Sequence, residues 1–246
     1  MEDRSSSSSP GREVTDYSVG SSVRRALKEP GRAISYVLAL LRGYWYRAIL
    51  WALGRRFSAG RRFRAFGRLS VRGPGSVVFG DDVALWGRVN AWTYARDARI
   101  IIADGVMMSG TRFACACQIR VGRNSILADA AIRDTDFHST RADRRSASAP
   151  IRVAPVEIGD NVWVAASAIL LPGTHVGENS VIGAAAVCMR SFPANKVILG
   201  NPAKVAMHIP SIEDGEGNTA EGLRAPTKDE DISYRNEPVS SNAAPQ

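Results

Sequence analysis

The sequence contains few of the side chains that exchange protons at neutral pH. Its 246 residues include only three histidines and three cysteines. A general base that titrates near pH 7 must therefore be sought at three positions. The cysteines are odd in number, and Cys115 and Cys117 lie too close along the chain for an easy bridge. This excludes a disulfide framework, and we expect a reducing, cytoplasmic setting.

Long apolar runs are also absent. Residues 1–22 contain a serine run but no apolar segment of the signal-peptide type, so we expect a disordered tail there. The most apolar stretch, residues 33–54, is interrupted by Arg42 and Arg47 and falls short of the roughly 20 apolar residues of a membrane span. Residues 210–246 are rich in Glu, Asp, Asn, Ser and Pro, which predicts a second disordered tail.

Positive charge is concentrated in one segment. The formal net charge is +8, yet residues 23–72 carry 13 basic residues against Glu29 alone, a local charge of +12. Tryptophans and tyrosines are interleaved with these arginines, which favours a membrane interface over nucleic acid. We expect residues 23–68 to form a basic amphipathic segment, helical over 33–55. This helix would lie on an anionic membrane surface or pack against the protein itself, and no nucleic-acid partner is expected.

A bulky apolar residue returns at every sixth position between Pro155 and Cys188. A period of six fits neither a helix nor a flat strand, but it fits one short strand and one tight turn per repeat. Three such repeats close one coil of about 18 residues, and successive coils stack. The sequence therefore predicts an all-β fold, a parallel β-helix, whose inward positions include Cys188 as a small core hydrophobe. These positions are Ile158, Val164, Leu170, Val176, Ile182 and Cys188.

The repeats are less regular before residue 134 and are interrupted once. Residues 135–155 lack the period and consist largely of Arg, Ser, Ala and Asp, so we expect an excursion loop of the kind that usually carries function. A turn at 200–202 and the run AKVAMHI then predict an exit strand and a short closing helix. The expected β-helix domain covers 69–209 and contains about six coils. Its earlier inward positions are Phe79, Leu85, Ile102, Met108, Val121 and Leu127.

The run PVEIGDNVWVAASAILLPGTHVGENSVIGAAAVCMRSFPANKVILGNPAKV resembles the terminal coils of the hexapeptide-repeat acyltransferases. This is the family of galactoside, maltose and serine acetyltransferases, and the branch that modifies polysaccharides is most similar. The resemblance covers about residues 40–209 and is strongest from Asp134 to Ala206. It implies a left-handed coil, a hand that the composition does not give. It also implies acetyl-CoA as donor, a saccharide or glycan acceptor, and a homotrimer with its sites between neighbouring subunits.

The resemblance places the catalytic base at His138, where the last regular strand gives way to the excursion loop. In the family, a histidine here takes the proton from the acceptor hydroxyl or amine while that atom attacks the thioester. The second ring nitrogen then needs a partner to fix the tautomer. Asp134 and Asp136 are candidates because alternate residues of a strand share a face. A backbone carbonyl is the third alternative.

The resemblance also implies a donor site along the late coils. A backbone N–H at Ala165 or Ala166 matches the donor that stabilises the developing oxyanion. Trp163 matches a ring that lines the cleft, and Arg190 and Lys204 are expected to face the phosphates of the coenzyme. Small residues are expected to form a smooth wall for its extended arm, namely Ala165, Ala166, Gly183, Ala184 and Ala185.

Other functions of this fold make different demands on the sequence. We expect O-acetyl transfer to a sugar hydroxyl, with N-acetyl transfer to an amino sugar and a non-catalytic scaffold as alternatives. A scaffold has no need of His138 and its loop. A zinc enzyme of the γ-carbonic anhydrase type needs three converging histidines, but His175 should point outward and His208 lies beyond the coils, so no metal is expected. A nucleotidyltransferase would need a further α/β domain before Ser70, for which there is no room.

Overall fold

The computed structural model describes residues 30–210, so the tails expected at 1–22 and 210–246 lie outside it, apart from Pro210. Helix α2 (Pro30–Ala52) is followed by short strands in three sheets. Sheet A contains β1 (Arg56–Ala59), β4 (Ser76–Phe79), β7 (Arg99–Ile102), β10 (Gln118–Val121), β13 (Val156–Ile158), β16 (His175–Val176) and β19 (Ser191–Phe192). Sheet B contains β2 (Arg64–Ala65), β5 (Ala84–Trp86), β8 (Met107–Ser109), β11 (Ile126–Ala128), β14 (Trp163–Val164), β17 (Val181–Ile182), β20 (Lys196–Leu199) and β21 (Lys204–His208). Sheet C contains β3 (Arg68–Arg72), β6 (Arg88–Thr93), β9 (Arg112–Cys115), β12 (Ala131–Arg133), β15 (Ile169–Leu170) and β18 (Val187–Cys188).

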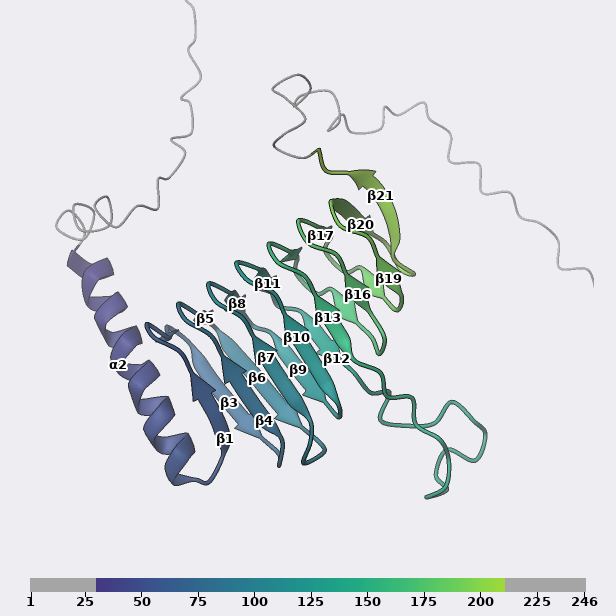
Figure 1. Ribbon diagram of the computed structural model, residues 1–246, viewed down its shortest axis with the longest axis horizontal. Coiled ribbons are helices and arrows are strands. Elements are labelled where there is room, and N and C mark those ends of the chain that lie inside the picture. The colour runs from purple at the N-terminus through teal and green to yellow at the C-terminus, as the bar shows by residue number, and fades with distance from the viewer. Residues whose placement is uncertain (1–29, 211–246) are drawn as a thin grey trace, which may run out of the picture. The chain divides into compact units, whose positions relative to one another are not determined.

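The chain visits the three sheets in turn, so every coil pairs in parallel with the coils before and after it (Figure 1). The predicted left-handed parallel β-helix is confirmed, with about seven turns instead of six. The additional coil begins at Arg56, before the expected start at residue 69. Its repeat was obscured because arginines occupy many outward positions there, while Phe63 points into the core and is only 2% exposed.

The predicted inward positions form the core. The six repeat residues from Ile158 to Cys188 are at most 2% exposed, and so are the six earlier positions from Phe79 to Leu127. Asparagines occupy several corners where the backbone has positive φ, a conformation that Asn tolerates better than most residues. Asn161 and Asn179 are two of these, and the Asn161 amide donates to the Asn179 side-chain oxygen one coil away at 3.0 Å.

The predicted closing helix is wrong, because the run AKVAMHI forms strand β21. The chain reverses after Gly200, which has φ +92°, and β21 pairs antiparallel with β20. The backbone groups on the open edge of β20 provide hydrogen-bond partners that a separate short helix would leave unused. This pairing outweighs the local preference of the sequence, and it places His208 on a strand.

Helix α2 packs against β1 and β2 of the first coil (Figure 1). It spans residues 30–52, close to the expected 33–55, and its buried face consists of Ala39, Gly43 and Leu50. A Cβ atom at Gly43 would lie 2.2 Å from the carbonyl oxygen of Phe63, so the close approach of helix and coil requires glycine here.

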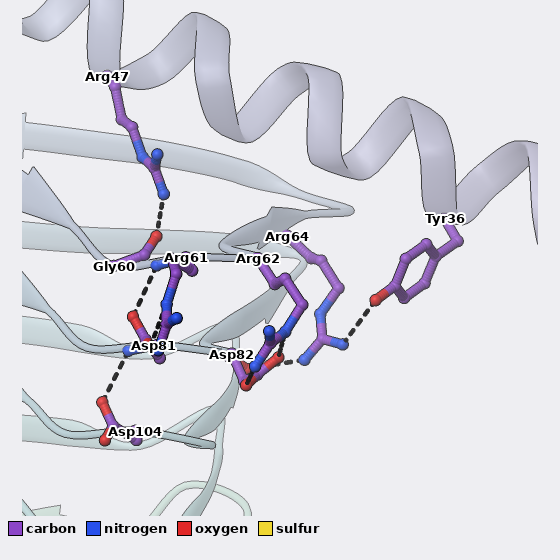
Figure 2. A network of polar contacts seen from close by, with 9 residues as sticks. All are labelled: Tyr36, Arg47, Gly60, Arg61, Arg62, Arg64, Asp81, Asp82 and Asp104. Carbon is purple, nitrogen blue, oxygen red and sulfur yellow. Dashed lines mark hydrogen bonds and ion pairs between the residues drawn. The ribbon is translucent and has the colours of Figure 1, made fainter. Parts of the chain in front are cut away.

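Hydrogen bonds from arginines of the helix and of the first coil hold α2 against the coil (Figure 2). Arg47 on the helix donates to the carbonyl of Gly60, and Arg64 on the coil donates to the Tyr36 hydroxyl at 3.2 Å. Arg42 donates to the carbonyl of Phe66 at 3.0 Å. The arginines that interrupt the apolar sequence of the helix therefore turn back toward the protein.

Two further arginines of the basic segment are neutralised at a corner of the coil (Figure 2). Arg61 pairs with Asp81 at 2.8 Å, and Arg62 pairs with Asp82. The guanidinium groups hold the pKa of both carboxyls below their usual values, chiefly through the side-chain hydrogen bonds. The local charge of +12 is thus less available to partners than the sequence implies.

Candidate functional site

The excursion loop leaves the stack between β12 and β13 (Figure 1), as the sequence predicts. Its neck is closed by an antiparallel bridge between Thr135 and Val153. Two backbone hydrogen bonds flank this bridge, from Asp136 N to the Arg152 carbonyl at 3.1 Å and from Ala154 N to the Asp134 carbonyl at 2.9 Å. The first residues of the loop are therefore fixed relative to the coil.

His138 follows directly after this neck and is exposed. The preceding residue, Phe137, has φ +63° and contacts the Tyr94 ring edge to face, with the ring centroids 4.7 Å apart. Tyr94 directly follows β6, so this contact holds residues 137–138 against an earlier coil of the stack. Within residues 30–210 the His138 ring has no hydrogen-bond partner, which leaves both of its nitrogens available to a substrate.

The two aspartates proposed to orient His138 lie in different surroundings. Asp134 is fully buried, and its carboxylate accepts hydrogen bonds from Ala116 N at 2.6 Å and Cys117 N at 2.8 Å. The Asp134 side chain therefore stabilises the turn of the neighbouring coil. Asp136 is partly exposed, and its carboxylate makes no hydrogen bond to another described residue. Of the two, Asp136 is the one that remains free to meet the imidazole.

The cysteines fit a structural role. Burial, followed by the nearby Asp134 carboxylate, raises the pKa of the Cys117 thiol to about 11 and also raises the pKa of Cys115. Burial raises the pKa of Cys188 to about 12. Thiols with such pKa values remain protonated near pH 7, so they are poor nucleophiles.

The remaining histidines lie on strands. His175 on β16 points outward, as predicted, with Nδ1 3.5 Å from a carboxylate oxygen of Glu157. His208 on β21 contacts the Lys196 ammonium at 2.9 Å. No three metal-ligating side chains gather within residues 30–210.

The small residues proposed for the donor wall occupy stacked corners of the late coils. Ala165 N and Gly183 N donate to carbonyls of the next coil, at 2.8 Å in both cases. Ala166 and Ala184 are exposed one residue further on, and their N–H groups donate to no other described residue. The backbone thus distinguishes the candidates, since Ala166 and Ala184 keep a free N–H. Trp163 lies beside the first corner on the outer face of β14 and is 51% exposed.

The two basic residues proposed to face the coenzyme come together at the last coil. Arg190 donates to the carbonyl of Ala203 at 3.4 Å, and Lys204 is the next residue. The Arg190 guanidinium also lies over the Phe192 ring, 5.5 Å from its centroid. Lys204 is exposed at the start of β21.

The sequence did not predict a groove of about 1030 Å³ between α2 and the outer face of β3 and β6. Its lining includes Arg42 and Trp45 from the helix. The strands contribute Arg68, Arg72, Arg88 and Trp92. The sequence signal for this groove is the alternation of outward polar and aromatic residues along β3 and β6. This alternation indicates a groove only once the pairing of the two strands is known.

Comparison with known proteins finds a matching repeat profile and solved structures of the same fold. Residues 155–189, the region of regular repeats, match the profile of the bacterial transferase hexapeptide (six repeats). The polysialic acid O-acetyltransferase OatWY shares the fold, with a TM-score of 0.54 and 22% identity over 69% of this chain and 82% of that one. The chain thus carries the hexapeptide repeat over residues 155–189 and shares the fold of this acetyltransferase.

Curated relatives match parts of the chain. The Saccharomyces cerevisiae protein YJL218W, named as an acetyltransferase, is 49% identical over 55 residues, which are 22% of this chain and 28% of the relative. Escherichia coli WbbJ, named as a lipopolysaccharide biosynthesis O-acetyl transferase, is 27% identical over 144 residues, 55% of this chain and 73% of the relative. Among the first curated relatives, the matched share of the relative's own length is between 24% and 53%.

Proposed function

We propose that this protein is a hexapeptide-repeat acyltransferase that transfers an acetyl group from acetyl-CoA to a hydroxyl of a sugar or glycan. The observation that carries the proposal is the placement of His138 directly after the fixed neck of the excursion loop, with both ring nitrogens free. The similarity to WbbJ, named as an O-acetyl transferase, favours a hydroxyl as the acceptor. Transfer to the amine of an amino sugar is the alternative, since the same base would serve it.

In this proposal, one neutral nitrogen of His138 accepts the proton of the acceptor hydroxyl as the new C–O bond forms. Acetyl-CoA supplies the activated acyl group, and the C–S bond breaks. Protonated His138 then gives its proton to the departing sulfur, so that the thiol leaves and the base is restored. Asp136 acts as a positioning residue at the other ring nitrogen.

The donor site would lie along the late coils. The free N–H of Ala166 is suited to donate to the acyl oxygen, where negative charge develops during the reaction. The stacked small corners at Ala166 and Ala184 leave room for an extended arm. Arg190 and Lys204 at the last coil supply positive charge for the phosphates.

The proposed base is tested by His138→Ala, with His175→Ala as the matched control on an outward-facing strand position. Loss of a positioned base is expected to lower turnover by about 10² to 10⁴-fold, with thermal unfolding unchanged. Free-thiol release is measured with a panel of neutral, acidic and amino sugars, which also separates O- from N-transfer. Turnover of His138→Ala within a few-fold of the wild type would contradict the assignment.

We also propose that the active form is a homotrimer, in which the excursion loop of one subunit reaches the neighbouring coil. The support is the position of His138 on a loop that leaves its own stack (Figure 1). Light scattering combined with activity measurement tests the assembly. A fully active monomer would rule it out, because the site would then be complete within one chain.

A peripheral position on an anionic, cytoplasmic membrane face is the third part of the proposal. The face of α2 turned away from the coil is apolar, with exposed fractions from 53% to 80% at Ile34, Val37, Leu38, Tyr44 and Trp51. Because Arg42 and Arg47 turn back toward the coil, they do not interrupt this face. Within residues 30–210, no helix is long and apolar enough to cross a bilayer. An exposed apolar helix face with Trp and Tyr is typical of an interfacial helix.

A further inference from the structure

The groove between α2 and sheet C differs from the rest of the surface in its charge balance. Four arginines line it, Arg42, Arg68, Arg72 and Arg88, and no acidic residue does. Arg68 and Arg88 lie directly opposite each other in the pairing of β3 with β6. Like charges at opposite positions of paired strands are destabilising, so the arrangement costs stability in the absence of a bound anion.

Several arginines elsewhere on the coil are paired with carboxylates. Arg61, Arg112 and Arg123 each contact an aspartate of a neighbouring coil, at 2.8 to 3.3 Å. By contrast, the side chains of Arg68 and Arg88 are exposed and make neither a hydrogen bond nor an ion pair with any residue in 30–210. The groove therefore holds four arginines and no acidic lining residue, an arrangement suited to an anionic ligand.

Aromatic and neutral polar groups accompany these cations. The Trp92 indole N–H donates to the Ser70 hydroxyl at 3.4 Å, and the Arg72 guanidinium lies 5.3 Å from the Trp92 ring centroid. Asn90 lies between Arg88 and Trp92 on the same outward face of β6. A flat apolar ring beside amide and hydroxyl groups is suited to a sugar, whose ring has an apolar face and polar edges.

The groove also leads toward the proposed base. β6 carries Arg88, Asn90 and Trp92 and is followed by Tyr94, whose ring contacts Phe137 beside His138. At about 3.3 Å per residue, the distance along the strand from Arg88 to Tyr94 is about 20 Å. An extended ligand of several sugar rings that lies along β6 would therefore reach His138.

We infer that this groove binds an acidic glycan, with its carboxylate or phosphate groups on the arginines and a sugar ring on Trp92. Modification of that glycan at His138 rests on the proposed function, whereas binding in the groove does not. The groove thus accounts for selection of acidic acceptors at a distance from the reacting hydroxyl.

Binding is measured with the full chain, without acetyl-CoA, by titration calorimetry at low and at physiological salt. The carboxylated probe is a polygalacturonate oligosaccharide, the neutral probe is a maltooligosaccharide of equal length, and mannose 6-phosphate represents a sugar phosphate. We expect the two acidic probes to bind and the neutral one to bind at least about tenfold more weakly, with a preference that falls as salt is raised. Equal binding of acidic and neutral oligosaccharides overturns the inference.

Two variants locate the site. Arg68→Ser combined with Arg88→Ser is expected to weaken polygalacturonate binding at least about tenfold, while Arg120→Ser, an exposed arginine on sheet A, leaves it unchanged. Asn90→Asp nearly preserves shape and places a carboxylate among the arginines, so it should weaken binding without loss of fold. Because Arg68 and Arg88 repel each other, their replacement should not lower the melting temperature, as it would if they only supported the fold.

The outcomes separate the inference from the proposed function. Charge-selective binding that depends on Arg68 and Arg88 supports the inference even if no tested acceptor leads to thiol release from acetyl-CoA. The absence of thiol release would contradict only the proposed activity. If the double variant instead loses phosphatidylglycerol vesicle binding and keeps polygalacturonate binding, the groove is a lipid site and the inference is wrong.

Discussion

The early coils, residues 56–133, and the late coils, residues 156–199, have the same interior and different exteriors. Both are filled by residues that are fully or almost fully buried. The late strands β14 to β19 have two residues each, and small residues form their corners, whereas the early strands reach six residues and carry arginine and tryptophan outside. Regularity of the repeat thus reports how uniform the surface is, and it does not report how well the core is packed.

This difference agrees with the two roles that we propose, donor binding on the late coils and acceptor binding on the early coils. In that proposal, the extended arm of acetyl-CoA needs a wall of small residues, which the regular late coils provide. In the same proposal, the irregular early coils supply the long outward strands that line the groove for the acceptor. The excursion loop lies between the two regions in sequence, and it brings His138 to their boundary.

The largest expected effect tests whether the two interiors are equivalent. Leu85 in an early coil and Leu170 in a late coil are both fully buried. Replacement of either by alanine should cost about 2 to 5 kcal/mol, through lost burial and a cavity. Chemical denaturation of both variants provides the comparison. If Leu170→Ala is far more costly than Leu85→Ala, the regular coils are the more tightly packed, and the equivalence is wrong.

The second prediction concerns the early end of the molecule. Val37→Ser, Tyr44→Ser and Trp51→Ser together should weaken partitioning onto anionic liposomes about a hundredfold, since partial burial of each side chain contributes about 1 kcal/mol. Co-sedimentation at two salt concentrations measures the effect. Val78→Ser with Met107→Ser, exposed apolar residues on the coil, is the control. Equal partitioning of both variants would show that α2 makes no contact with lipid.

The smallest effect is expected at the last coil. Lys204→Glu should weaken the binding of acetyl-CoA by about 1 to 3 kcal/mol, which raises the apparent KM with little change in kcat. The effect should shrink at high salt. Lys196→Glu reverses a charge on the same hairpin, beside His208, and is expected to leave both constants unchanged. Identical kinetics for Lys204→Glu and the wild type would remove Lys204 from the donor site.

The sequence predicted the late coils and the excursion loop because their determinants are local. A bulky residue at every sixth position has one arrangement that buries all of them, and the interruption after residue 134 marks the loop directly. The first coil was missed because arginines surround Phe57 and Phe63 and hide the period. The closing helix was predicted wrongly because the partner that makes β21 a strand, the open edge of β20, is a tertiary feature.

The candidate site was predictable to a similar extent. His138 and the corners at Ala166 and Ala184 follow from motifs along the chain, and they remain proposals. The burial of Asp134 on a neighbouring turn could not be inferred from its spacing to His138. The groove depends on the register that sets Arg68 opposite Arg88, residues 20 apart in sequence with no shared motif.

The reversal at Gly200 also bears on the behaviour of this protein at high concentration. A stack of parallel coils has no intrinsic length, because each coil presents the row of backbone groups that the next one needs. At one end α2 packs on β1 and β2, and at the other β21 runs opposite to every strand of sheet B. A second molecule therefore cannot continue that sheet in the same sense. Conversion of this hairpin to a straight exit would expose a parallel edge and favour end-to-end growth into fibres.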